Sequence, residues 1–214
     1  EGTELQPDPT EVFEVSAIAT GTDGVIWAVT GCDLRFLPPG DGGGALINWG
    51  GYQFCSSSSD KATDILVNED NVIISTGANG VYVIEYNLSS NQSQIGIQGI
   101  TRWDSGNFLA SNRITDLQMM GNQLLISTEN AGISRRDMAT STWLSRWSTG
   151  NTLASNNVLG TSVSDGWMHV LAGNTLQSYE ISSGIFRAQE TMPGLGLLDS
   201  AVSISSWPSG IGFR

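Results

Sequence analysis

The sequence predicts an all-β fold built from repeated four-stranded units, and its composition is the first observation that predicts it. Charged residues make up only 14% of the 214 residues, while 26 are glycine. Few charges and many small turn-forming residues are typical of many short strands joined by tight turns. No stretch shows a long apolar pattern of period 3.6, so helices are not expected. A hydrophobic content of 39% with seven Trp indicates a packed core rather than disorder.

The second observation is an internal repeat. The segment from Trp103 to Ile114 recurs without gaps from Trp147 to Val158, and seven of its twelve positions are identical. The two copies lie 44 residues apart. This period lies in the range of a four-stranded blade of a β-propeller.

The third observation is a set of apolar runs in phase with the repeat. Each run is short, is typical of a strand and ends in a small residue, and the four end residues are 46, 52 and 44 residues apart: Ile26–Thr30, Val72–Thr76, Leu124–Thr128 and Met168–Ala172. Apolar residues at consecutive positions indicate strands that are covered on both faces of a sheet.

One repeat shows the expected order of strands. We predict strands over residues 114–119, 123–128, 133–137 and 142–147, joined by turns at 121–122 and 130–132. Their equivalents should follow 44 residues later. Such a meander cannot bury both of its faces alone, and stacking several around an axis solves this.

We therefore predict a β-propeller of about five four-stranded blades within residues 1–214. The blades should lie near residues 13–50, 60–103, 112–147 and 156–190, with a partial fifth over 197–214. Ser200-Ala201-Val202 resembles Ser16-Ala17-Ile18, so the fifth blade should begin there, turn at residues 208–210 and be incomplete at the C-terminus. Residues 1–12 contain Pro7 and Pro9, which suit an added strand poorly. We expect either part of a longer propeller or a ring completed by self-association.

Residues 103–147 resemble the two-component regulator propeller repeat, and residues 60–86 and 148–180 resemble it in part. The resemblance is carried by three segments that match the family pattern in order: Leu109-Ala110-Ser111-Asn112-Arg113-Ile114, Leu124-Leu125-Ile126-Ser127-Thr128 and Ala131-Gly132-Ile133-Ser134-Arg135-Arg136-Asp137. Ala110 stands where the family has Pro, Ser127 where it has Gly, and Arg136 where it has Tyr. The resemblance implies an extracytoplasmic (periplasmic or secreted) propeller used for sensing or recognition, and it implies no catalytic residues.

The charge balance limits the partners. The net charge is −12 with a single Lys, so phosphate backbones and anionic membrane surfaces should be repelled, and we expect no nucleic-acid partner. No apolar run approaches the roughly 18 residues of a membrane span, so no membrane insertion is expected. The chain opens without Met and has the character of a mature or trimmed segment. The sequons at Asn87 and Asn91 indicate a polar surface loop.

The two cysteines are expected to form a disulfide. Cys32 falls in the turn between the second and third strands of the first blade, and Cys55 falls in the connection to the second blade. Both segments should emerge on the same side of a meander. The alternative is two separate thiols in a reducing compartment.

The chemistry-bearing residues predict no catalytic, metal or cofactor site. Three recurring Asp-Gly or Gly-Asn pairs, at residues 23–24, 121–122 and 165–166, suit hairpin turns and lack the alternating oxygen ligands of a calcium loop. His169 falls on a predicted second strand, where a packed or edge histidine is the simpler interpretation and a catalytic group the alternative. The segment from Asp137 to Trp143 is similar to the blade-docking motif of quinone-dependent dehydrogenases, but it lacks the Gly of that motif. We interpret it as a turn followed by a packing Trp.

The repeated loops before the first strands supply the candidate binding face. Asn112 and Asn156 occupy the same repeat position, where a side chain bonding its own backbone is the simpler interpretation and a ligand contact the alternative. The next position carries Arg113 in one copy and Asn157 in the other, and variable loop residues on a repeat can set binding specificity.

We therefore predict a non-catalytic binding or sensory propeller. Its ligand, whether a small molecule, a carbohydrate or a protein, is not identified by the sequence. A propeller-scaffold lyase or hydrolase is the alternative, for which carboxylates are available at Asp64, Asp116 and Asp165. A structural or assembly module is a further alternative.

Overall fold

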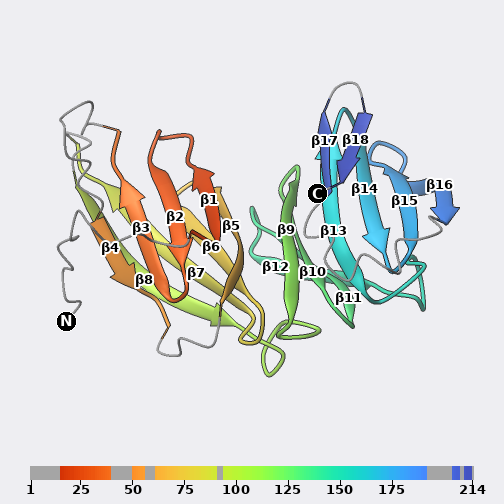
Figure 1. Ribbon diagram of the computed structural model, residues 1–214, viewed down its shortest axis with the longest axis horizontal. Coiled ribbons are helices and arrows are strands. Elements are labelled where there is room, and N and C mark those ends of the chain that lie inside the picture. The colour runs from red at the N-terminus through yellow and green to blue at the C-terminus, as the bar shows by residue number, and fades with distance from the viewer. Residues whose placement is uncertain are drawn as a thin grey trace. The chain divides into compact units, whose positions relative to one another are not determined.

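The fold is all-β and consists mainly of four-stranded antiparallel sheets (Figure 1). The structure is a computed structural model that describes residues 15–39, 50–55, 61–90, 94–191, 204–207 and 210–213. These residues form eighteen strands and no helix, and accordingly no described helix has the length and apolarity to cross a membrane.

Each four-stranded sheet is a meander, because its strands pair in the order in which they follow along the chain. The first sheet contains β1 (Ala17–Thr20), β2 (Ile26–Thr30), β3 (Asp33–Leu37) and β4 (Gly50–Gln53). The second contains β5 (Ala62–Asn68), β6 (Asn71–Thr76), β7 (Val81–Leu88) and β8 (Ile95–Trp103). The third contains β9 (Ile114–Met120), β10 (Gln123–Thr128), β11 (Gly132–Asp137) and β12 (Thr142–Trp147). The fourth contains β13 (Val158–Ser164), β14 (Trp167–Ala172), β15 (Thr175–Glu180) and β16 (Ile185–Thr191).

The strands predicted from the repeat are confirmed. The four predicted strands of residues 114–147 match β9 to β12 to within one residue, and their equivalents 44 residues later match β13 to β16 to within two. The second strands are the most buried, as their consecutive apolar residues predict. In β10 every residue from Leu124 to Thr128 is buried, and the same holds from Val72 to Thr76 in β6.

The first strands of the second, third and fourth sheets share a bulge. The pairing with the second strand shifts by one residue at the same place in each, next to Thr63, Thr115 and Leu159. A bulge adds one residue to one strand and bends it. Its recurrence shows that the repeat extends to backbone detail that the sequence pattern does not reveal.

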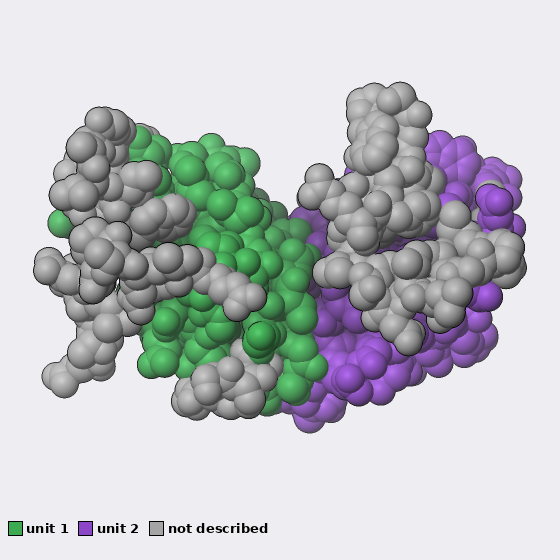
Figure 2. All heavy atoms as spheres, viewed as in Figure 1, with its two compact units in different colours: residues 1–103 green, residues 104–214 purple. Residues whose placement is uncertain are grey.

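The chain divides into two compact units, residues 1–103 and 104–214 (Figure 2). In the first unit one apolar core joins the first and second sheets, with Trp27 edge-on to Tyr86 and Phe54 edge-on to Tyr82. In the second unit one apolar core joins the third and fourth sheets around Trp147, Tyr179 and Phe186.

Neighbouring sheets within a unit also meet through polar contacts that involve carboxylates. Asp116 of β9 accepts hydrogen bonds from the backbone N–H and the hydroxyl of Thr161 of β13, at 2.8 and 2.5 Å. In the first unit the Tyr86 hydroxyl donates to Asp23 at 2.8 Å. Burial, together with this carboxylate, raises the pKa of Tyr86 above its usual range. The first strands β9 and β13 lie side by side, as do β1 and β5.

A disulfide joins Cys32 and Cys55, whose Cα atoms are 5.1 Å apart. The Phe54 N–H donates to the Cys32 carbonyl at 3.0 Å, so the turn after β2 and the end of β4 are also joined by their backbones. The bond therefore ties two loops of one sheet together, on the side where both emerge.

One sequence-based prediction is wrong. Asn87 of the first sequon does not lie in a loop, because β7 continues to Leu88 and Asn87 pairs with Gly96 of β8. Its side chain lies close over Gly96, where an added Cβ would come within 2.6 Å of Oδ1. The second sequon, at Asn91, falls outside the described residues.

The C-terminal segment contributes a further strand pair. Strand β17 (Ile204–Trp207) pairs with β18 (Gly210–Phe213), and β17 lies beside β13 (Figure 1). The rest of the expected incomplete blade lies outside the described residues, at positions 197–203, 208–209 and 214, and so do residues 1–12.

Candidate functional site

The loop of residues 104–113, which leads into the third sheet, is built like the loop of residues 148–157 that leads into the fourth. In the first loop the N–H groups of Phe108 and Leu109 both donate to the Asp104 carbonyl, and the Asn107 side chain accepts from the Asp104 N–H at 2.8 Å. The same bonds recur around Ser148 and Asn151 in the second loop. The identical residues of the repeat therefore maintain the loop conformation.

Asn112 and Asn156 also serve the loop. The Asn112 side-chain oxygen accepts from the Ser105 N–H at 2.6 Å, and the Asn156 oxygen accepts from the Thr149 N–H at 2.9 Å. Each bond joins residues that are seven positions apart in the loop. These contacts match the interpretation of a side chain that bonds its own backbone.

The next position, which differs between the two copies, is exposed in both. Arg113 forms an ion pair with Glu129, in which both side chains are largely exposed. The Asn157 side chain makes no hydrogen bond to any of the residues that the structure describes, whereas its carbonyl accepts from the Gly173 N–H at 2.7 Å. The four predicted residues thus divide into two that hold the loops and two that vary on them.

This division predicts different effects of two neighbouring substitutions. Asn112→Ala should lower the free energy of unfolding by about 1 kcal/mol, because the Ser105 N–H loses its acceptor. Arg113→Ala should change it by less than about 0.5 kcal/mol, since exposed ion pairs contribute little. Urea denaturation of both variants measures the difference. Equal losses would mean that Asn112 is not the structural residue of the pair.

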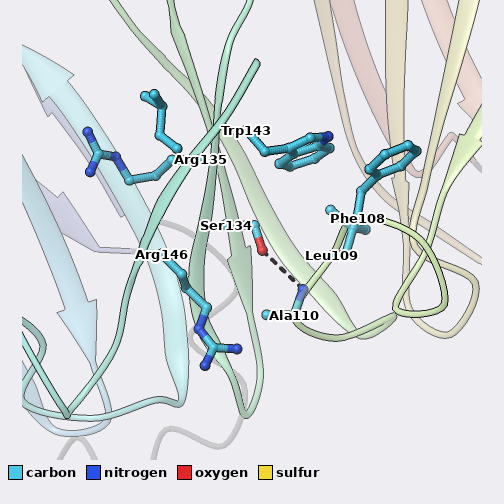
Figure 3. Close-up of a pocket in the computed structure, with 8 residues that line it drawn as sticks. Phe108, Leu109, Ala110, Ser134, Arg135, Trp143 and Arg146 are labelled. Carbon is cyan, nitrogen blue, oxygen red and sulfur yellow. Dashed lines mark hydrogen bonds between the residues drawn. The ribbon is translucent and has the colours of Figure 1, made fainter. Parts of the chain in front are cut away.

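A small open pocket of about 230 Å³ lies beside the loop of residues 104–113 (Figure 3). It is lined by side chains from this loop and from β11 and β12: Phe108, Leu109, Ala110, Ser134, Arg135, Trp143, Leu144 and Arg146. The Ala110 N–H donates to Ser134 Oγ at 3.2 Å, which fixes the loop against β11.

The two ends of the pocket differ in character. The Phe108 and Trp143 rings are stacked, with centroids 5.6 Å apart and planes 10° from parallel, although Phe108 stays 50% exposed. Figure 3 shows this pair at one end and Arg146 at the other, with Ser134 and Ala110 between them. The pocket therefore offers a flat apolar surface and a cation.

Three arginines gather on the two strands that border the pocket. Arg135 donates to Gln123 Oε1 and to the Ser145 carbonyl, and its guanidinium lies 4.2 Å from the centre of the Trp147 ring. Arg136 lies over Trp143. Burial lowers the pKa of both guanidinium groups below its ordinary value, but arginine stays protonated in proteins. Within the described residues, no carboxylate forms an ion pair with Arg135 or Arg146.

This pocket was not among the sites predicted from the sequence. A usable signal was present, since Phe108 stands where the second copy of the repeat has Thr152, within a segment that is otherwise largely identical. What the sequence alone could not show is that β12 brings Trp143 against the loop.

The remaining candidate residues have structural partners. The pairs at residues 23–24, 121–122 and 165–166 lie in turns between first and second strands. Asp137 accepts from the Thr140 N–H at 3.0 Å, as a turn residue does. His169 Nδ1 lies 3.0 Å from Ser178 Oγ, and burial lowers the pKa of its imidazole. Asp64 accepts from the Ile65 N–H at 2.8 Å. Among the described residues, no group of three or more potential metal ligands comes together.

No family model matches the sequence, and no curated protein matches it in a sequence search. Its fold is nevertheless similar to those of solved structures. The extracellular domain of BT4673, assigned to a one-component system of B. thetaiotaomicron, has a TM-score of 0.66 at 15% identity, over 100% of this chain and 31% of that one. The extracellular domain of BT3049, assigned to a hybrid two-component system of the same organism, has a TM-score of 0.58 at 17% identity, over 85% and 25%.

A third similar structure is PorZ, a bacterial surface component of the type-IX secretion system of Porphyromonas gingivalis. It has a TM-score of 0.58 at 12% identity, over 95% of this chain and 26% of that one. The chain thus spans less than a third of the length of each of these three proteins. At such identities the likeness concerns the fold, and the similar structures are propeller-like domains.

Proposed function

We propose that this chain is part of an extracytoplasmic β-propeller that binds a ligand without transforming it, as a sensory or recognition domain of the two-component regulator propeller type. The proposal rests on two observations taken together, the internal repeat and the similarity of the fold to solved extracellular domains. The chain repeats a four-stranded meander with the loops of that family's pattern, and two of its structural neighbours are extracellular domains of proteins assigned to signalling systems.

The Cys32–Cys55 disulfide supports the extracytoplasmic location. Disulfides form and persist in the oxidising periplasm and outside the cell, whereas cytosolic thiols are mostly kept reduced. The structural neighbours are extracellular domains or a surface component, in agreement with that location.

The four sheets are interpreted as four consecutive blades, and the pair β17–β18 as the start of a fifth. The placement of β17 beside β13 supports this, because β9 and β13 adjoin in the same way. The short span of the chain relative to its structural neighbours favours a propeller that contains further blades.

The repeated loops supply the proposed binding surface. Their identical residues fix the backbone, and the positions that differ between copies, such as Arg113 and Asn157, can contact a ligand without loss of the fold. Repeat proteins in general divide their sequence in this way, between a shared scaffold and a variable face.

A thermal-shift screen tests the proposal. Neutral and acidic sugars, short peptides and divalent ions are added one at a time to the purified chain. A compound that binds the native state raises the melting temperature in proportion to the logarithm of its concentration above Kd. We expect at least one class to do so and the shift to shrink in variants of the loop face or of the adjoining pocket. A flat response to all classes would contradict the proposed function.

A further inference from the structure

The pocket beside Phe108 differs from the rest of the molecule in charge. The chain carries 21 acidic and only nine basic residues, yet three of those nine lie on β11 and β12: Arg135, Arg136 and Arg146. Arg146 is exposed, and none of the described residues pairs with its guanidinium. A cation that pairs with no carboxylate in the described part of the chain, in a protein of net charge −12, is a local site of attraction for anions.

Two of the three arginines, Arg135 and Arg136, have no basic counterpart in the second and fourth sheets, whereas Arg146 occupies the same repeat position as Arg102 of β8. By strand pairing, Arg135 and Arg136 face Leu125 and Leu124 on the second strand. The equivalent positions of the fourth sheet hold Ser178 and Tyr179, and those of the second sheet hold Val83 and Ile84. Neither arginine is therefore required by the blade architecture.

The aromatic end of the pocket also has no counterpart in the loop that leads into the fourth sheet. The second copy of the loop has Thr152 in place of Phe108, although the buried leucine that follows is kept as Leu109 and Leu153. Leaving a Phe ring half exposed on the surface has a cost in water. A flat exposed ring is a common platform for the face of a sugar or of another ring.

The volume limits the size of the group that enters. At about 230 Å³ the pocket is smaller than the roughly 300 Å³ at which pockets for drug-sized ligands begin. It accommodates a single ring with a short substituent. Since the aromatic pair and Arg146 lie at opposite ends, the ring and the charge of the ligand should also lie at opposite ends (Figure 3).

We infer that this pocket binds a carboxylate carried on a six-membered ring, with the ring on the Phe108–Trp143 pair and the carboxylate at Arg146. The inference rests on the proposed ligand-binding function and names the chemistry of one of its ligands. Arg146 supplies a planar set of donors that matches a carboxylate. Arg135 and Arg136 add positive potential at the border. Two sources carry this chemistry, a uronic-acid unit of a saccharide and an aromatic carboxylate.

The test uses two acids, each with a neutral counterpart. A disaccharide ending in glucuronic acid is compared with the same disaccharide ending in glucose, and 3-phenylpropionate is compared with 3-phenylpropanol. Each is titrated into the isotope-labelled chain, and the Trp143 indole N–H signal is followed by two-dimensional NMR. We expect at least one acid to bind about tenfold more tightly than its neutral counterpart, which is the discrimination that one charge-assisted hydrogen bond provides. The acid that does so identifies the source.

Three variants locate the binding. Arg146→Gln should remove the tenfold preference for the acid and leave the neutral compound unaffected. Phe108→Leu keeps an apolar side chain but loses the flat ring, and should weaken acid and neutral compound alike. Arg187→Gln removes the same charge from an ion pair with Glu180 outside the pocket, and should leave both affinities within twofold. The amide spectrum of each variant establishes that it is folded.

Two results would overturn the inference. One is equal binding of acid and neutral compound in both pairs, or none of the four compounds shifting the Trp143 signal. The other is an acid preference that survives Arg146→Gln as well as it survives Arg187→Gln. If the thermal-shift screen still yields a ligand in either case, the proposed function stands and only the assignment of this pocket falls.

Discussion

Replacing Gly132 by alanine is expected to lower the free energy of unfolding by about 2 kcal/mol more than replacing Gly166 by alanine. Both glycines have a positive φ, +83° and +81°, which costs an L-residue roughly 1–2 kcal/mol at either position. They differ in the space available. A Cβ at Gly132 would lie 2.1 Å from the Trp147 carbonyl oxygen, whereas a Cβ at Gly166 would meet nothing within 4 Å.

The Trp147 carbonyl, which would clash with a Cβ at position 132, cannot easily move away. It belongs to the end of β12, where the buried Trp147 side chain packs in the core of the third and fourth sheets. The Gly132 N–H also donates to the Asn156 carbonyl at 2.9 Å, so movement at this point disturbs the loop that leads into β13. Equilibrium urea denaturation of the two variants isolates the clash from the backbone strain. Equal destabilisation would show that β11 and β12 do not approach each other this closely in solution.

Loss of the disulfide is the second large effect. The double variant Cys32→Ala/Cys55→Ala should be less stable by about 3 kcal/mol in the chain-entropy model, given a separation of 23 residues. Amide hydrogen exchange in β2 to β4 should accelerate, because these strands flank the two cysteines.

The wild-type chain under a reducing agent supplies the control for that pair of substitutions. It should lose the same stability as the double variant, and the reducing agent should not affect the double variant. A wild-type chain that is insensitive to reduction would mean that the two thiols are not bonded, and the extracytoplasmic proposal would lose one of its two supports.

The sequence predicted the strands of the third and fourth sheets because a repeat reports the same element more than once. Two copies of Trp-x-x-Gly-Asn-x-Leu-Ala-Ser-Asn set the phase, and the buried runs Leu124–Thr128 and Met168–Ala172 then marked the second strands. The bulge next to Thr115 was not predicted, because a bulge depends on the pairing partner and leaves no local pattern.

The extent of β7 shows the same limit. Asn87, Leu88 and Ser89 are typical of a loop by composition, but pairing with β8 keeps the chain extended to Leu88. Pairing with the neighbouring strand therefore decides the conformation of these residues, against their local preference for a loop.

The site was predicted only in part. Asn112 and Asn156 were candidates because they are identical in the two copies of the repeat. In the structure, both side chains accept a hydrogen bond from the backbone of their own loop. The pocket depends on Phe108 meeting Trp143, 35 residues along the chain. No local pattern reports such a contact.

The most direct test of the central claim measures the fate of a bound compound. A ligand that raises the melting temperature is incubated with a catalytic amount of the chain, and its concentration is followed over time by mass spectrometry. A domain that binds without transforming its ligand predicts full recovery of the unchanged compound alongside the thermal shift. Steady conversion of the compound over many turnovers, lost in variants of the same site, would contradict that claim and point to an enzyme on a propeller scaffold.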